Sequence, residues 1–206
     1  GEVIYGTSWD NSDYGMLYWE KEGAGFGRPQ WVGEDVREIT PTVMQYQDGT
    51  EYDYNLVNGC ICQAQLTKIS PSGKWIATTY RTETPSANRQ YVEYTYAAAF
   101  YNTETGTTTI VEDYGETTGV HVTDDGIGFI GIGTLGVSAG KVYDLNTHTD
   151  LGDTQDWVYD TYGIVIPGGY INHISADGRY VLGTSAQSSA GGTSFINWYI
   201  APPRAK

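Results

Sequence analysis

The chain has 206 residues, of which 39% are hydrophobic and 17% charged, so it carries enough apolar material for the core of one domain. Its 25 acidic and 11 basic residues leave a net charge of −14, which argues against nucleic-acid binding and against a surface that seeks anionic lipid. No stretch approaches the roughly 20 apolar residues that a membrane-spanning helix requires, so we expect no insertion into a membrane.

The chain opens on residues 3–8, a strand-like segment that matches residues 180–185 near the other end. No charged segment followed by an apolar one precedes it, so we expect no targeting peptide in this sequence, and the chain closes on the linker-like residues 201–206. Both ends therefore indicate a piece of a longer polypeptide, in which flanking repeats or domains would adjoin this one.

An insertion of about twenty residues distinguishes the first part of the chain from the repeats described below. Residues 43–47 and 50–54 alternate in polarity around Asp48-Gly49, which predicts a β-hairpin. Its ring-bearing face either reaches over a site or a partner, or covers an exposed sheet edge, and the sequence leaves both open. The rings on that face are Tyr46, Tyr52 and Tyr54.

Two cysteines, Cys60 and Cys62, follow this insertion with one residue between them. On a strand both side chains face the same side, and a ring closed over so short a spacing is strained against ordinary disulfide geometry. We expect two free, half-buried thiols, and two thiolates alone are too few for a structural zinc site. The cysteines thus leave the redox compartment undecided.

Three later segments align without gaps: residues 69–79, 122–132 and 174–184. Each combines a short apolar strand that ends in Ser or Thr, a four-residue turn, and a β-branched or aromatic return strand. The turns end in Gly73, Gly126 and Gly178, which lie 53 and 52 positions apart. This pattern predicts type I turns whose glycine takes a positive φ.

Further strands follow each turn, at residues 97–101 and 107–111, at residues 141–144 and less clearly after Leu151, and at residues 195–198. No window sustains the apolar spacing of a helix, so we expect none. Four short strands per unit of ~50 residues are typical of a β-propeller blade.

The sequence therefore predicts an all-β, propeller-like array of about four blade repeats in a single domain, with a β-sandwich as the alternative. The first unit lacks its innermost strand and the last lacks its fourth. The units are residues 1–59, 60–115, 116–166 and 167–206 of the domain 1–206.

The repeated motif, residues 174–178 followed by Gly183-Thr184-Ser185 and an aromatic strand, resembles the HAF-type and TolB-like propeller repeats of bacterial exported or cell-surface proteins. One unit departs from the pattern, with Ser72 where the others have Asp125 and Asp177. The resemblance implies an extracytoplasmic protein, periplasmic or on the cell surface.

Aromatic and charged side chains collect in the segments predicted to join the strands at one end of the array. Flat rings beside carboxylates suit sugar recognition, because rings stack on apolar sugar faces and acids accept hydrogen bonds from hydroxyls. The alternative is that the rings merely cover a glycine-rich scaffold. The candidate ligand-binding residues are Trp9, Asp10, Tyr14, Arg81, Arg89, Tyr114, Trp157, Tyr159 and Tyr162.

Catalytic and metal-binding patterns are missing from the sequence. It has no Gly-x-Ser-x-Gly or His-Glu-x-x-His motif, so we expect no catalytic residue, cofactor or metal. Residues 10–13 and 144–146 offer oxygen ligands for calcium but are expected to be solvated turns. His121 and His173 occupy the same place in two units, which predicts a shared structural hydrogen bond to a neighbouring strand.

These patterns predict a non-enzymatic binding module of an exported protein. It would recognise a carbohydrate or a surface partner through the aromatic and acidic segments. One alternative is a glycoside hydrolase or lyase with acids in a central cleft, which requires a pair of carboxyl groups of which one has a raised pKa. The other is an architectural spacer without a ligand.

Overall fold

The computed structural model describes residues 3–10, 13–61, 67–112, 114, 117–133, 139–189 and 192–201, and the backbone alone at residues 8–10, 13–14 and 187–189. Strands account for 61% and helices for 7% of the chain, which confirms the all-β class.

The strands form four antiparallel sheets and one separate hairpin. Sheet I contains β1 (Val3–Asp10), β2 (Asp13–Glu22), β3 (Gly25–Phe26) and β4 (Gln30–Trp31). A short 3-10 helix, η1 (Glu34–Val36), leads from it to the hairpin of β5 (Glu38–Gln45) and β6 (Glu51–Asn58). Sheet II contains β7 (Cys60–Ile61), β8 (Lys68–Ile69), β9 (Trp75–Pro85), β10 (Val92–Asn102) and β11 (Thr107–Val111). Sheet III contains β12 (Thr117–Val122), β13 (Ile127–Ile132), β14 (Ala139–Asp144) and β15 (Thr149–Asp153). Sheet IV contains β16 (Tyr170–Ile174), β17 (Val181–Ser189) and β18 (Gly192–Ile200).

Successive strands pair with one another in sheets III and IV, so each unit folds as an antiparallel meander. Among the described residues, sheet IV has three strands and β1 pairs only with β2.

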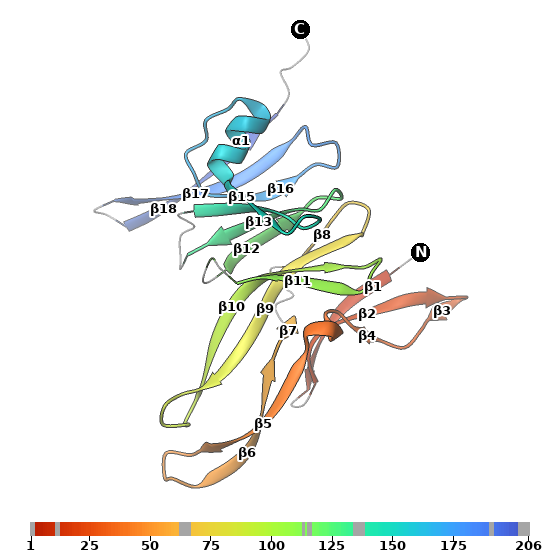
Figure 1. Cartoon of the computed structure of the whole chain (residues 1–206), viewed down its shortest axis with the longest axis vertical. Coiled ribbons are helices and arrows are strands. Elements are labelled where there is room, and N and C mark those ends of the chain that lie inside the picture. Colours follow the sequence, from red (N-terminus) through yellow and green to blue (C-terminus); the bar gives the residue numbers. More distant parts are fainter. Residues whose placement is uncertain are drawn as a thin grey trace.

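Sheets II, III and IV follow one another along the long axis of the molecule, and sheet I lies beside sheet II (Figure 1). None of them closes on itself. The closed ring of a propeller is thus not observed, and the stacked antiparallel sheets fit the β-sandwich alternative.

Most of the core of the described residues lies in three apolar layers between consecutive sheets, and Val57 and Cys60 form a fourth, smaller cluster. The alternation of side chains along each strand supplies both faces of a sheet, so that in β9 Ile76 packs toward sheet I and Ala77 toward sheet III. Between sheets II and III, Phe100 packs against Ile130 and its neighbours. Between sheets III and IV, Phe129 and Val181 belong to one buried cluster.

The three predicted turns are confirmed. The amides of Gly73, Gly126 and Gly178 donate to the carbonyl three residues earlier, at 2.8, 3.1 and 2.8 Å, and their φ angles are 81°, 83° and 68°. In each turn the first residue has a hydroxyl that accepts the backbone N–H of the return strand. The hydroxyl residues are Ser70, Thr123 and Ser175.

The gap-free alignment of the three units is wrong by one residue in sheet III. The amides of Ser70 and Ser175 donate to the carbonyls of the residues five positions later, Trp75 and Tyr180. The amide of Thr123 instead donates to the carbonyl four positions later, that of Ile127. Ile127 rather than Gly128 therefore takes the place of Trp75 and Tyr180. Glycine spacing fixes the turn but not the first backbone pair of the strands that it joins.

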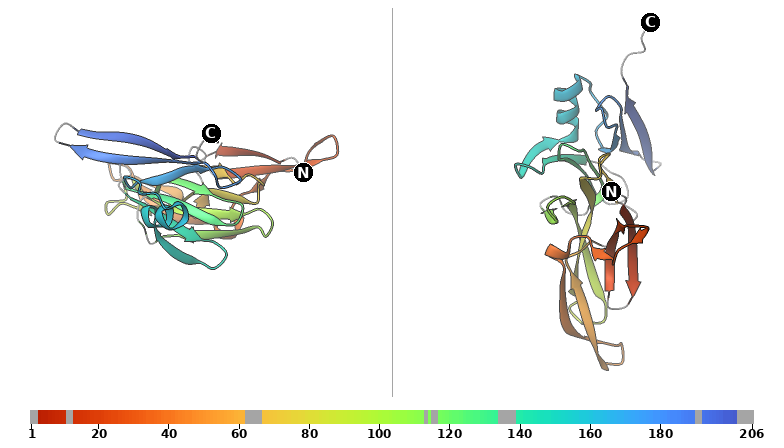
Figure 2. Two further views of the ribbon diagram at one scale, coloured as in Figure 1. Left: turned by 90° about the horizontal axis from the view of Figure 1, so that it is seen from above. Right: turned by 90° about the vertical axis from the view of Figure 1, so that its right-hand side faces the viewer.

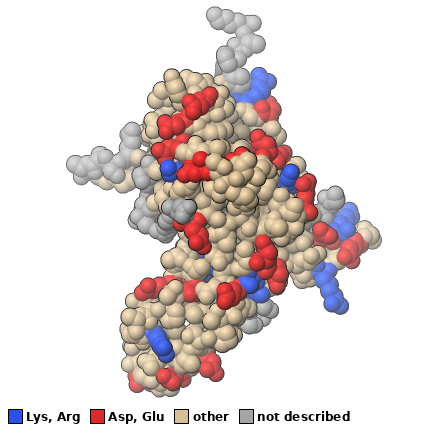
Figure 3. Space-filling view, viewed as in Figure 1, with Lys and Arg blue, Asp and Glu red and all other residues tan. Residues whose placement is uncertain are grey.

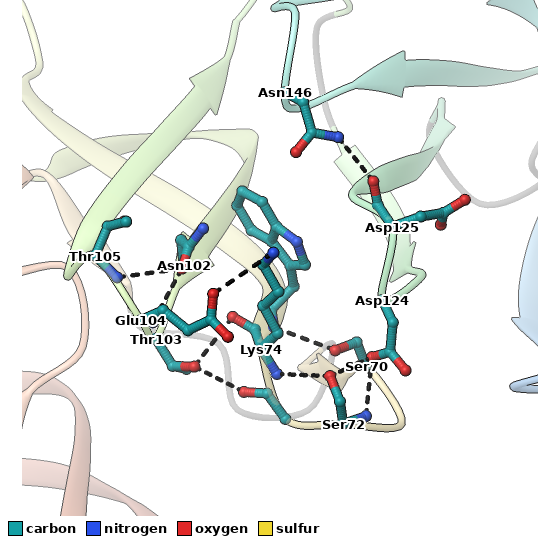
Figure 4. A network of polar contacts seen from close by, with 12 residues as sticks. Ser70, Ser72, Lys74, Asn102, Thr103, Glu104, Thr105, Asp124, Asp125 and Asn146 are labelled. Carbon is teal, nitrogen blue, oxygen red and sulfur yellow. Dashed lines mark hydrogen bonds and ion pairs between the residues drawn. The ribbon is translucent and has the colours of Figure 1, made fainter.

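Ser72, which stands where the other two turns have Asp, forms a contact with the next sheet. Its amide and hydroxyl donate to the Asp124 carboxylate at 2.8 and 2.6 Å, which ties the turn of sheet II to the turn of sheet III. Figure 4 shows this contact within a polar network at the turn end of the two sheets. Asp125 meanwhile accepts from Thr123 within its own turn.

The predicted hairpin is confirmed and is longer than the sequence indicated, since β5 and β6 pair over eight residues each. It lies beside the distal half of β9: the Glu83 carboxylate accepts the Val57 amide at 2.9 Å, and the Gln45 amide donates to the Arg89 carbonyl at 2.9 Å. These contacts favour the edge-covering role of the hairpin over a role above a binding site.

The expectation of no helix is wrong. A nine-residue helix, α1 (Thr154–Tyr162), follows sheet III, and its Val158 is buried in the cluster between sheets III and IV. Gly163 ends it in the left-handed conformation, at φ 69°. No helix in the described part of the chain is long and apolar enough to span a membrane.

The expectation of two free thiols is wrong as well. Cys60 is disulfide-bonded, and its side chain is buried at the start of sheet II. Cys62 lies outside the described residues.

Glycine at position 169 should be more important for stability than glycine in the exposed turn at 178. Both take positive φ, but a Cβ atom on Gly169 would overlap the Thr184 carbonyl, whereas nothing lies near that of Gly178. Chemical denaturation should show a loss of about 1–2 kcal/mol for Gly178→Ala, from the left-handed backbone alone. Gly169→Ala should lose more than about 3 kcal/mol because the backbone of β17 must also move. Equal losses in the two variants would contradict the close approach at Gly169.

Candidate functional site

One groove brings together two of the predicted ligand-binding residues, Trp157 and Tyr162, and we call it the turn groove. It lies at the turn end of sheets III and IV, beneath α1, and has a volume of about 430 Å³. Its lining consists of Pro71, Thr123, Asp124, Asp125, Ile127, Trp157, Thr161, Tyr162, Ile174, Ser175, Ala176, Asp177 and Gly178.

Helix α1 positions the two rings of the turn groove. The Trp157 ring meets the buried Phe129 ring edge-on at 4.9 Å and the Tyr162 ring at 5.9 Å between centroids. The Tyr162 hydroxyl donates to the Gly178 carbonyl at 2.9 Å, which fastens the end of the helix to the turn of sheet IV. Burial raises the pKa of Tyr162, so the hydroxyl stays protonated and keeps donating.

Two acids of the turn groove are held in the charged form. Burial acts to raise the pKa of Asp124, but the hydrogen bonds from Ser72 and Ser70 and the charge of Lys74 together outweigh it, so the pKa lies below its usual range. The Ser175 hydroxyl at 2.6 Å and the Arg179 amide at 3.1 Å lower the pKa of Asp177. Both carboxylates are therefore ionised at neutral pH and act as hydrogen-bond acceptors.

The turn groove combines apolar rings with hydrogen-bonding groups. It combines two half-buried rings, carboxylate acceptors and the hydroxyl-bearing Thr161. A general acid needs a raised pKa, and the resolved shifts of Asp124 and Asp177 are in the other direction. Among the described residues, no group of three or more His, Cys, Asp or Glu side chains is placed to hold a metal ion.

The other predicted residues lie elsewhere. Tyr159 is on α1 but exposed, outside the lining of the turn groove. Tyr114 packs beside sheet III, where its ring lies 5.6 Å from the Lys141 ammonium and its hydroxyl helps to lower the pKa of Asp150. The side chains of three more predicted residues lie outside the described part of the structure: Trp9, Asp10 and Tyr14.

The two predicted arginines lie where the β5–β6 hairpin packs against the β9–β10 hairpin. Arg81 forms an ion pair with the buried Glu83 at 2.6 Å and lies 5.0 Å above the ring of Tyr94. Arg89 has a φ of 56° at the tip of the β9–β10 hairpin, where its carbonyl accepts from Gln45. Neither lines the turn groove.

Two further hollows contain none of the predicted residues. One, of about 530 Å³, lies over β9 and β10 around Tyr80 and Thr95. The other, of about 490 Å³, lies between β1 and the turn at Ser70. We therefore take the turn groove as the candidate site.

The sequence did not single out the acids of the turn groove as ligand-binding residues. Asp124, Asp125 and Asp177 lie in tight turns, where Asp is common for reasons of backbone geometry alone. The predicted topology also placed Trp157 and Tyr162 at the opposite end of the sheets, since it took residues 155–162 for a loop. Asp153 before the segment and Gly163 after it are the boundary signals that could have revealed the helix.

The predicted structural hydrogen bond is confirmed for His121 alone, since His173, at the same place in the next unit, is exposed. The Nε2 of His121 accepts the Ile174 amide at 3.0 Å, across the boundary between sheets III and IV. Burial lowers the pKa of His121 to about 4, and the nearby His173 and Lys68 add to the effect. The imidazole is therefore neutral, and Nε2 is free of a proton as the hydrogen bond requires.

Comparison with known proteins gave no match: no family model, no curated protein and no solved structure is similar to this chain. The resemblance to HAF-type and TolB-like repeats therefore stays a prediction, and the functional argument depends on the turn groove.

The buried imidazole of His121 should make stability fall with acidity. In the unfolded chain it takes a proton near pH 6.5 and in the folded protein near pH 4, so the unfolded state binds more protons between these values. The free energy of unfolding should drop by about 2.5 kcal/mol between pH 7 and pH 4.5 from this group alone. His121→Gln, which keeps an acceptor but does not titrate, should show a correspondingly shallower pH profile in urea denaturation.

His148→Asn is the matched control, because His148 is exposed in a turn. Its profile should follow that of the wild type. Parallel profiles for wild type and His121→Gln would contradict the burial of a neutral imidazole.

Proposed function

We propose that the chain is a non-enzymatic binding module that takes a short, neutral carbohydrate in the turn groove. The observation that carries this proposal is the presence of Trp157 and Tyr162 in one groove with Asp124, Asp125 and Asp177. The rings come from the connection between two sheets, and the acids come from the turns of both.

The size of the groove supports a ligand of one or two sugar rings. Its volume of about 430 Å³ lies toward the lower end of the range of small-molecule sites, roughly 300–1,000 Å³. Apolar sugar faces pack against aromatic rings, while hydroxyls donate to carboxylates.

Charge supports a neutral ligand over an acidic one. Asp124 and Asp177 are ionised at neutral pH, and the chain carries a net charge of −14. A uronic acid or a sulfated sugar would meet repulsion in the groove and around it. A sugar with only hydroxyl groups would not.

The proposal includes an exported protein whose sheets follow the order of propeller blades. Equivalent residues of sheets II and III, Ala77 and Phe129, both pack toward the next sheet, as the repeated faces of blades would. The disulfide at Cys60 supports an oxidising, extracytoplasmic compartment.

Isothermal titration calorimetry of the full chain tests the proposal, with neutral oligosaccharides chosen after a glycan-array screen. Asp177→Asn should weaken binding by roughly ten- to a hundredfold, since one charge-assisted hydrogen bond is worth roughly 1.5–3 kcal/mol. Trp157→Ala should abolish measurable binding. Asp177→Asn keeps an oxygen for the turn contacts at Ser175 and Arg179, so its fold should be intact.

Tyr159→Ala is the control on the same helix, because Tyr159 is 57% exposed and does not line the groove. It should bind like the wild type. Absence of binding to any glycan by the wild-type protein would contradict the proposal and would favour the spacer alternative. Equal weakening in Tyr159→Ala and Asp177→Asn would place the ligand outside the turn groove.

A further inference from the structure

Sheet IV exposes a face that the preceding sheets bury. The turn hydrogen bonds make Ala77 in sheet II, Phe129 in sheet III and Leu182 in sheet IV equivalent. Ala77 and Phe129 are 0% exposed because the following sheet packs on them, whereas Leu182 is 44% exposed.

The cross-strand partners of these residues repeat the contrast. Phe100 lies opposite Ala77, Val142 opposite Phe129 and Tyr199 opposite Leu182. Phe100 and Val142 are 0% exposed, and Tyr199 is 79% exposed. The outward face of sheet IV is therefore built for packing against a sheet, and no described residues form a sheet on it.

Sheet I exposes the complementary kind of face. Residues 3–8 match residues 180–185, so Ile4 is equivalent to Val181, which is 1% exposed against sheet III. Ile4 is 48% exposed. Tyr5 packs in the layer between sheets I and II, so strand alternation turns Ile4 to the opposite side.

The same glycine–indole packing marks both faces. The Trp198 ring lies over Gly183 in sheet IV, and the Trp19 ring lies over Gly6 in sheet I. In sheet IV this face is covered by sheet III, with Trp198 buried. In sheet I the Trp19 ring is only half-buried, opposite the exposed Ile4.

We propose that copies of this chain associate head to tail, with the outward face of sheet IV in one copy packed on the outward face of sheet I in the next. These two kinds of face already meet inside the molecule, where Phe129 of sheet III packs toward Val181 of sheet IV. Because the two surfaces differ, the contact is heterologous and produces rings or open chains larger than dimers.

Charge favours a second copy at this place. A chain with a net charge of −14 repels its own copies, and acidic side chains are spread over the visible face of the molecule (Figure 3). β17 and β18 contain no charged residue. The β17–β18 hairpin and sheet I also extend toward opposite sides of the molecule, which leaves both accessible (Figure 2).

Sedimentation velocity of the full chain over a wide concentration range tests the proposal. The wild type should form species larger than dimers as the concentration rises. Leu182→Lys blocks the face of sheet IV and Ile4→Lys blocks the face of sheet I. Each variant alone should stay monomeric, while an equimolar mixture should form dimers and nothing larger, since each partner keeps one intact face of the opposite kind.

Val165→Lys is the matched control, because Val165 is a 74% exposed apolar residue in the loop after α1, outside both faces. It should associate like the wild type. Unfolding midpoints confirm that each variant is folded. Tyr199→Lys replaces Leu182→Lys, and Trp19→Lys, at the cross-strand partner of Ile4 on the same face, replaces Ile4→Lys, if either fails to fold.

Three results would overturn the proposal. A wild type that stays monomeric at every concentration shows that the faces do not meet. Self-association of folded Ile4→Lys shows that sheet IV pairs with itself or with another surface. A mixture of the two folded variants that stays monomeric shows that the two faces do not recognise each other.

Discussion

The structure depends on the two apolar faces of each sheet, both of which must be covered. Strand alternation in β9 sends Ile76 one way and Ala77 the other, and neither side chain is exposed because sheets I and III cover them. A single unit of this size could not bury both of its faces alone. Consecutive units therefore stabilise one another by covering each other's faces. Sheets I and IV stand at the two ends of this series, so each has one apolar face that no neighbouring sheet of the described residues covers.

Polar contacts at the turn end fix how consecutive sheets lie against each other. Ser72 bonds to Asp124 between sheets II and III, and His121 bonds to Ile174 between sheets III and IV. Between sheets III and IV, helix α1 also contacts the turn end, where the Tyr162 hydroxyl donates to the Gly178 carbonyl. The turn groove lies at this boundary, so the candidate site is a product of stacking and is not contained in any one unit.

Local patterns in the sequence predicted local structure well. The turns at Gly73, Gly126 and Gly178 and the hairpin at Asp48-Gly49 follow from short-range geometry, and the structure contains all four. The helix at Thr154–Tyr162 was missed because it is nine residues long and is stabilised by burial of Val158 between two sheets, which no local window contains. The gathering of the acids in the turn groove likewise depends on contacts between distant segments.

The stacking of consecutive sheets is tested most directly at the hydrogen bond from the Ile174 amide to His121 Nε2, since this bond forms only if sheets III and IV pack against each other. Nitrogen–nitrogen scalar coupling across this bond, recorded by NMR on uniformly labelled protein at neutral pH, should be detected, and the Ile174 amide should exchange slowly with solvent. An absent coupling together with a rapidly exchanging Ile174 amide would contradict the stacking of consecutive sheets.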